Sequence, residues 1–268
     1  MTAALRSPAE VTLFCWKALF LRFAGSRLSS TRAAAFWIIA EPVSHITFFM
    51  LIFTYLRVRH IGGINTALWI MAGLLAFFMF RRAAAGAMEV VTESKQLYAL
   101  PQIKPVDTVL VKTVLEGFLM AIVAAILMAG VGLVGLDVVP ADPLVVMVAM
   151  FGLWLLGTGY GLIASVAKEL LPPVGGAIMS FILRILYFVS GPIIPVTMFI
   201  PPKYYDWLLY NPVYNGIEGM RVGFAPYYHV LPGVNISYLY FCAVMLIFLG
   251  LSLHVHYSHQ LINRHDKN

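Results

Sequence analysis

Residues 144–167 read LVVMVAMFGLWLLGTGYGLIASVA, 24 consecutive residues without a charged side chain. About 20 apolar residues in an α-helix cross the roughly 30 Å hydrocarbon core of a bilayer. Five other stretches are similarly apolar: 33–56, 64–80, 113–136, 177–199 and 236–257. Because an unpaired backbone cannot face lipid, we expect a helix in each, with Pro42, Pro192 and Pro195 as kinks rather than stops. The sequence predicts an all-α integral membrane protein with six transmembrane helices in one domain, 33–257.

The composition supports a membrane protein. Of the 268 residues, 61% are hydrophobic and 11% are charged, whereas about 25% are charged in a typical soluble domain. So few charges cannot cover a soluble globule of this size. The net charge of +6 comes from basic residues between the apolar stretches, where they set orientation. We therefore expect no nucleic-acid partner.

The Lys and Arg residues of the connecting segments predict the orientation. With the N-terminus in the cytoplasm, thirteen of them lie inside and four outside. Cytoplasmic loops carry an excess of such residues. We expect both termini to be cytoplasmic, with residues 258–268 as a short tail.

The first 32 residues form a separate basic segment. The stretch from Glu10 to Phe23 has a partly apolar helical stripe, with Lys17, Arg22 and Trp16 suited to the headgroup region. We expect a cytoplasmic interfacial helix in 1–32 rather than a seventh span.

Residues 81–112 form the only substantial cytoplasmic loop that this topology allows. Helix-forming residues there are followed by Pro101 and Pro105, so a short helix within about 88–100 is predicted. One interpretation is a solvated connector. The other is a contact surface for a cytoplasmic partner, made by Glu89, Glu93, Lys95 and Tyr98.

The external segment 200–235 is rich in aromatic residues and proline. Its eight aromatics are Tyr204, Tyr205, Trp207, Tyr210, Tyr214, Phe224, Tyr227 and Tyr228. Its lengths fit two short re-entrant helices, about 203–210 and 213–223, covered by protein or lining a cavity. The aromatics either form an interfacial belt or line a substrate path or gate, in which case Tyr204, Tyr205, Trp207 and Tyr210 would contact sugar rings.

Glu41, His45 and Arg184 are ionisable residues well within the predicted spans, and Glu116 lies close to an interface. Glu41 and Arg184 lie at similar depths, so an intramembrane ion pair between them is predicted. Alternatively, Arg184 faces a phosphate on a substrate path or reaches the headgroups. In a membrane enzyme acting on lipid-linked sugars, the three residues well within the spans would be catalytic.

Sequence motifs for nucleotide or metal chemistry are absent. There is no G-x-x-x-x-G-K-[ST] phosphate-binding loop, H-E-x-x-H or G-x-S-x-G. The glycines of 157–161 lie inside a predicted span, where small residues permit close helix packing. His254, His256 and His259 are interpreted as a solvated helix end rather than a metal site. We therefore expect no cofactor or metal on this chain.

Two sets of sequence motifs resemble those of a known family. Ser190-Gly191-Pro192-Ile193-Ile194-Pro195, Ile200-Pro201-Pro202, Tyr210-Asn211-Pro212, and the pair Glu218 and Arg221 resemble the signature of ABC-2-type exporter permeases. Residues 100–107, LPQIKPVD, followed by Leu115-Glu116, are similar to the subunits that export capsular polysaccharide.

The resemblance implies a transport subunit of the bacterial inner membrane rather than an enzyme. It implies a homodimer with a channel, driven by two copies of a separate cytoplasmic ATPase that bind ATP and magnesium and dock on the loop after the second helix. The implied substrate is a lipid-linked anionic polysaccharide, passed on to a periplasmic co-polymerase or adaptor and to outer-membrane export proteins. The alternatives are an ABC-2 permease for O-antigen, teichoic acid or a small molecule.

Overall fold

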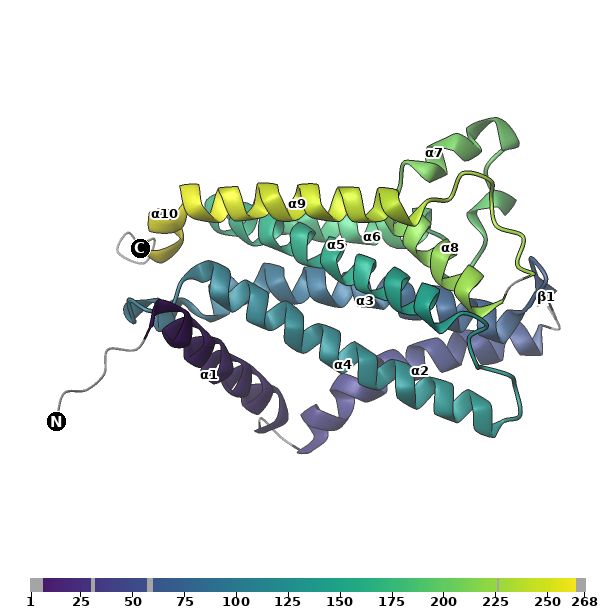
Figure 1. Ribbon diagram of the computed structural model, residues 1–268, viewed down its shortest axis with the longest axis horizontal. Helices are drawn as coiled ribbons and strands as arrows, with labels where there is room; N and C mark the ends of the chain where they lie inside the picture. Colours follow the sequence, from purple (N-terminus) through teal and green to yellow (C-terminus); the bar gives the residue numbers. More distant parts are fainter. Residues whose placement is uncertain (1–6, 30–31, 57–59, 226, 264–268) are drawn as a thin grey trace.

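The computed structural model describes residues 7–29, 32–56, 60–225 and 227–263 as an elongated bundle of helices (Figure 1). The long helices are α1 (Pro8–Ser29), α2 (Arg32–Tyr55), α3 (Thr66–Glu93), α4 (Pro105–Leu133), α5 (Pro143–Leu170), α6 (Val174–Val189) and α9 (Ile236–His256). The shorter elements are β1 (His60–Ile61), β2 (Ile64–Asn65), η1 (Lys95–Ala99), η2 (Val196–Met198), η3 (Pro202–Tyr204), α7 (Tyr205–Leu209), α8 (Pro212–Phe224) and α10 (Ser258–Asn263).

Several sequence predictions fall on residues outside this description. They are residues 1–6 and 30–31 of the predicted interfacial segment and residues 264–268 of the predicted tail. Five basic residues used for orientation also lie outside it: Arg6, Arg57, Arg59, Arg264 and Lys267.

Five of the described helices are long and apolar enough to cross a membrane: α2, α3, α4, α5 and α9. This confirms the prediction of an all-α membrane protein. The predicted fifth span, 177–199, is shorter, because α6 ends at Val189 and Gly191 has a φ of 61°. Pro192 and Pro195 therefore follow a helix end and are not the kinks that the sequence predicts, whereas Pro42 does lie inside α2.

The centre of the bundle is α3, which packs against α5, α4 and α2. Most of its length is buried, from Thr66 to Val91. A Cβ atom at Gly157 would collide with the carbonyl oxygen of Phe80, and one at Gly161 would collide with Ala87. The glycines of α5 thus allow α3 and α5 to pack closely, as predicted.

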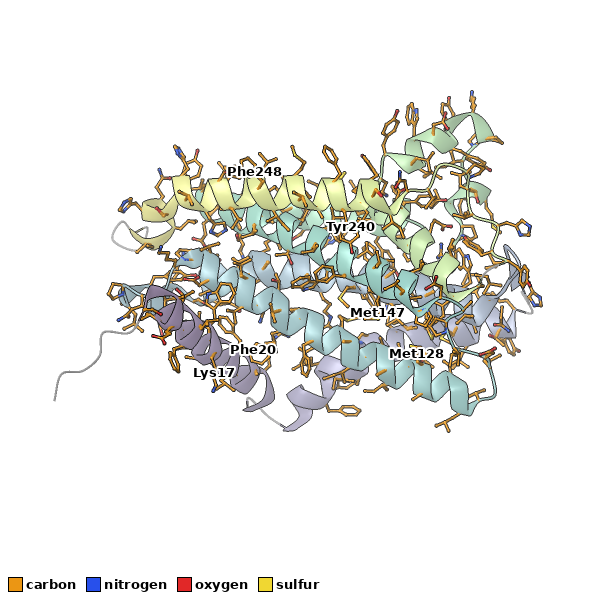
Figure 2. All side chains as sticks on the ribbon, viewed as in Figure 1. Lys17, Phe20, Met128, Met147, Tyr240 and Phe248 are labelled. Carbon is orange, nitrogen blue, oxygen red and sulfur yellow. The ribbon has the colours of Figure 1, made fainter. Side chains whose placement is uncertain are left out.

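The two ends of the bundle differ. The start of α1, α10 and η1 lie at one end, called here the terminal end; the β1–β2 hairpin, α7 and α8 lie at the other, the α8 end (Figure 1). Helix α1 packs against α4 and α2, with Leu19 and Phe23 buried. On α1, Lys17 and Phe20 lie at one edge of the bundle, and Phe248 lies on the outer side of α9 (Figure 2).

The predicted cytoplasmic loop 81–112 is largely helical. Helix α3 continues to Glu93 instead of ending near residue 80, and α4 begins at Pro105 instead of near residue 113. The predicted short helix is divided between the end of α3 and the 3-10 turn η1. The non-helical part of residues 81–112 is therefore confined to Ser94 and residues 100–104.

Candidate functional site

The start of α8 is fixed by the predicted Asn211-Pro212 pair. The Oδ1 atom of Asn211 accepts hydrogen bonds from the backbone N–H groups of Val213 and Tyr214, at 3.0 and 3.4 Å, and Pro212 occupies the first turn. These are favoured residues for capping and starting a helix. The Nδ2 atom of Asn211 donates to Ser190 Oγ at 2.9 Å. The pair therefore joins the start of α8 to the end of α6.

The predicted Glu218 and Arg221 form a buried ion pair on α8. Arg221 is 1% exposed, and its Nη1 atom lies 2.6 Å from Glu218 Oε1. Its Nη2 atom donates to the carbonyl oxygens of Gly191 at 2.9 Å and Pro192 at 3.2 Å. The guanidinium carbon lies 3.4 Å from the centre of the Trp69 ring. We call Glu218, Arg221 and Trp69 the buried clamp.

A tyrosine completes the clamp. The Tyr228 hydroxyl donates to Glu218 Oε2 at 2.7 Å and accepts from Trp69 Nε1 at 3.2 Å. Burial raises the pKa of Tyr228 to about 12, so this hydroxyl keeps its proton at neutral pH. Every charged atom of the clamp has a partner, and it therefore joins α3, α8 and the residues after α6 rather than presenting a reactive group.

Sequence reasoning missed Trp69 of the clamp and also Gly73, which lies against Arg221. A Cβ atom at Gly73 would collide with the Arg221 guanidinium and with the carbonyl oxygen of Pro192. Both residues lie in an apolar stretch with no local signal for a distant arginine. The Glu218 and Arg221 spacing was the only signal available.

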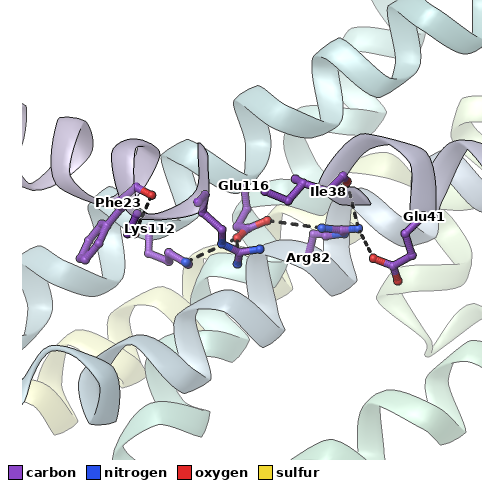
Figure 3. Close-up of polar contacts among 8 residues, drawn as sticks. Phe23, Ile38, Glu41, Arg82, Lys112 and Glu116 are labelled. Carbon is purple, nitrogen blue, oxygen red and sulfur yellow. Dashed lines mark hydrogen bonds and ion pairs between the residues drawn. The ribbon is translucent and has the colours of Figure 1, made fainter. Parts of the chain in front are cut away.

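A second charged cluster lies where α1, α2, α3 and α4 approach one another (Figure 3). Glu116 on α4 is 1% exposed. Its Oε1 atom lies 2.7 Å from Arg27 Nη2 and 3.7 Å from Lys112 Nζ, and its Oε2 atom lies 4.0 Å from Arg82 Nη1. Trp16 Nε1 of α1 also donates to Asp107 Oδ1 of α4 at 2.9 Å. These contacts hold α1 against α4.

The predicted ion pair between Glu41 and Arg184 is corrected by the structure. Glu41 Oε2 instead lies 2.7 Å from Arg82 Nη2. The sequence had placed Arg82 in a loop, but the continuation of α3 past residue 80 brings this arginine beside α2. In the described part of the chain, no carboxylate forms an ion pair with Arg184, which is exposed on α6. His45 contacts the Tyr187 hydroxyl at 3.2 Å.

The four predicted coupling residues have different surroundings. Glu93 is exposed at the end of α3, whereas Tyr98 is 6% exposed and its hydroxyl lies 2.9 Å from Thr108 Oγ1. Burial raises the pKa of Tyr98. Glu89 pairs with Lys168, and Lys95 Nζ lies 2.8 Å from Glu169 Oε2. Of the four, only Glu93 is both exposed and without an ion pair or side-chain hydrogen bond in the part of the chain that the structure describes.

The turn after η1 also presents an exposed tip, which the sequence prediction of coupling residues did not include. Leu100, Pro101 and Gln102 are all exposed there.

The outer aromatic residues separate into two groups. Trp207 is 71% exposed and Tyr210 74% exposed; Tyr204 is also exposed, with its ring centre 5.4 Å from that of Trp207. Tyr205 is partly buried and donates to the carbonyl oxygen of Thr197 at 3.1 Å. Three exposed rings, those of Tyr204, Trp207 and Tyr210, thus lie in or next to α7. The fourth residue, Tyr205, makes a hydrogen bond within the fold.

The prediction that the histidines at the end of α9 are all solvated is wrong for His254. His254 is buried, with Nε2 3.0 Å from Ser165 Oγ. Among the described residues, no group of three or more His, Cys, Asp or Glu side chains could hold a metal ion.

Long apolar helices joined by buried polar contacts define a multi-pass membrane protein. Residues 12–225 match the ABC-2 type transporter family. This match covers most of the chain, so the protein belongs to that family and is a transport subunit.

Three relatives match nearly the whole chain. It is 29% identical over 249 residues to the polysialic acid transport protein KpsM of Escherichia coli, covering 93% of this chain and 95% of that protein. It is 25% identical to the capsule polysaccharide export inner-membrane protein CtrC of Neisseria meningitidis serogroup B, with 88% of each chain covered. It is 23% identical to the capsule polysaccharide export inner-membrane protein BexB of Haemophilus influenzae, with 90% of each covered.

Proposed function

We propose that this chain is the membrane subunit of an ATP-driven exporter that moves lipid-linked capsular polysaccharide across the bacterial inner membrane. The similarity to KpsM, CtrC and BexB over about nine-tenths of each protein carries the proposal. Because the similarity is not confined to one helix, a shared transport path is the simplest account of it.

In this proposal the terminal end of the bundle faces the cytoplasm. The excess of Lys and Arg in the connecting segments at this end supports the orientation. Exposed Glu93 and the tip formed by Leu100, Pro101 and Gln102 dock on the ATPase. Two copies of that ATPase bind ATP and magnesium, and two copies of this chain form the channel.

The α8 end then faces the periplasm. Helix α6 and the residues up to 200 form the fifth of six spans, and α7 and α8 are re-entrant between this span and the sixth, α9. The exposed rings of Tyr204, Trp207 and Tyr210 contact sugar rings and gate or guide the chain. A periplasmic co-polymerase or adaptor receives the glycan here and leads it to outer-membrane export proteins.

The test is reconstitution with the candidate ATPase. We expect the two chains to co-purify and the lipid-linked glycan to stimulate ATP hydrolysis. Glu93→Lys should weaken co-purification and surface glycan, because it reverses an exposed charge at the docking face. The structure favours this single change, since reversing Lys95 would also break its contact with Glu169.

Asp206→Lys is the matched control, because Asp206 is an exposed carboxylate on α7 at the opposite end. Its binding to the ATPase should match that of the unmodified chain. ATP hydrolysis that the glycan does not stimulate would count against the proposed substrate. Equal effects of Glu93→Lys and Asp206→Lys on ATPase binding would count against the docking face.

A further inference from the structure

A cavity of about 1200 Å³ opens at the terminal end of the bundle. It lies between the end of α3, η1, the end of α5 and the start of α6. Five charged side chains line it: Glu89, Lys95, Lys168, Glu169 and Arg184. It is separate from the buried clamp, which lies at the α8 end.

The charges of this cavity leave a surplus of positive charge. Three cations face two carboxylates. Glu169 is buried, lies 2.8 Å from Lys95 and accepts from Thr92 Oγ1 at 2.6 Å. Glu89 pairs with Lys168. Both carboxylates are thereby engaged, while Arg184 has no ion-pair partner in the described ranges.

The Lys95–Glu169 and Lys168–Glu89 ion pairs differ in how far their side chains are exposed. Glu169 keeps 6% of its side chain exposed, whereas Glu89 keeps 45% and Lys168 keeps 26%. Exposed ion pairs contribute little free energy, because water solvates both partners when they separate. Lys168 can therefore exchange Glu89 for another anion at small cost, and it lies on the same cavity as Arg184.

The wall formed by α6 is apolar apart from Ser180 and Arg184. Ile178 and Phe181 line the cavity and are exposed. Ile185 and Phe188 are also exposed further along this helix. Residues three and four apart lie on one face of a helix. An apolar strip on α6 thus continues from the cationic cavity. This arrangement matches a lipid whose anionic headgroup lies in the cavity and whose acyl chains lie along the strip.

We propose that this cavity binds the phosphate of an anionic phospholipid headgroup, with Arg184 and Lys168 on the phosphate and the acyl chains along α6. Arginine presents several donors to phosphate oxygens, and lysine adds a mobile point charge. The inference rests on the proposed function for the cytoplasmic orientation of this end. It deepens that function by assigning a place where the lipid part of a lipid-linked substrate first binds.

The experiment measures lipid binding by the full-length chain in nanodiscs of phosphatidylcholine. A fluorescent phosphatidylglycerol probe is titrated in, and binding is read by energy transfer from a dye on the chain. We expect preference for this probe over a phosphatidylcholine probe with the same dye. Arg184→Gln and Lys168→Gln should each lower the affinity about fivefold, the effect of one basic residue near an anionic lipid surface. Arg184→Lys should retain most of the affinity.

A gain of binding provides a test that a misfolded variant cannot imitate. Glu89→Gln releases Lys168 and should raise the affinity for phosphatidylglycerol. The matched control is Lys17→Gln, because Lys17 is an exposed cation on α1 outside the cavity; it should leave the affinity unchanged.

Three outcomes would overturn the inference. The first is an equal loss with Lys17→Gln and Arg184→Gln, which would indicate bulk attraction. The second is displacement of the probe by millimolar inorganic phosphate, which would assign the cavity to a free anion. The third is no preference for phosphatidylglycerol. Because neither ATPase nor glycan is present, these results are distinct from failure of export, which would count against the proposed function alone.

Discussion

Replacing Arg221 with methionine tests the buried clamp. The substitution keeps an unbranched side chain of similar length but leaves the carboxylate of Glu218, which is 3% exposed, without its cation. Removing one partner of a buried ion pair costs about 3–5 kcal/mol. The contact with the Trp69 ring is lost as well, and a desolvated cation–π contact contributes about 2 kcal/mol. These terms overlap, so we expect a loss of about 3–5 kcal/mol in the free energy of unfolding.

The double variant separates the charge from the packing. Glu218→Gln removes the negative charge and keeps an oxygen that accepts from Tyr228. Together with Arg221→Met, it leaves no buried charge in the clamp. Because the uncompensated carboxylate is the expensive state, the double variant should recover at least about 2 kcal/mol of the loss.

The assay is reversible unfolding of the full-length chain in mixed micelles, with each variant measured alone and combined. Glu41→Gln serves as a control for removing a carboxylate, since Glu41 is 67% exposed and exposed pairs contribute about 0–1 kcal/mol. A loss below about 1 kcal/mol for Arg221→Met, or strictly additive effects of the two substitutions, would refute the account of the clamp as a coupled buried pair.

Other predictions concern three further places. Glu116→Gln should lower the free energy of unfolding by about 3 kcal/mol, because it leaves the nearby cations Arg27 and Lys112 without their shared carboxylate; a value like that of an exposed glutamate would contradict this. Gly73→Ala should cost about 1–3 kcal/mol in the same assay through collision with the clamp, and an unchanged stability would mean that the clamp moves freely. Combined Trp207→Ala and Tyr210→Ala should reduce surface glycan at constant protein abundance, since both rings are exposed; glycan that falls only with abundance would indicate a membrane anchor.

The apolar stretches predicted the class of protein and the approximate position of most helices. Periodicity and hydropathy report where a helix is apolar, not where it ends. The sequence therefore assigns the polar part of α3 from Arg81 to Glu93 to a cytoplasmic loop with a separate short helix within about 88–100. That single error explains the incorrect partner of Glu41, because Arg82 was not placed on a helix.

The candidate site was only partly predictable for a related reason. Glu218 and Arg221 are three residues apart on one helix, a spacing that sequence can detect. Their other partners come from α3 and from the residues after α6, and no local pattern reports such distant contacts. Likewise, the cavity beside Arg184 depends on how four elements meet.

Helix α3 carries both Trp69, at the clamp, and Glu89, at the cavity. Because it is one uninterrupted helix from Thr66 to Glu93, the angular positions of these two side chains around its axis are locked together. Each residue advances an α-helix by about 100°, since 3.6 residues complete a turn. One residue inserted near the middle of α3 would therefore keep its composition and hydropathy but prevent both ends from facing their partners at once. For this helix, the number of residues between the two sites is itself a structural requirement.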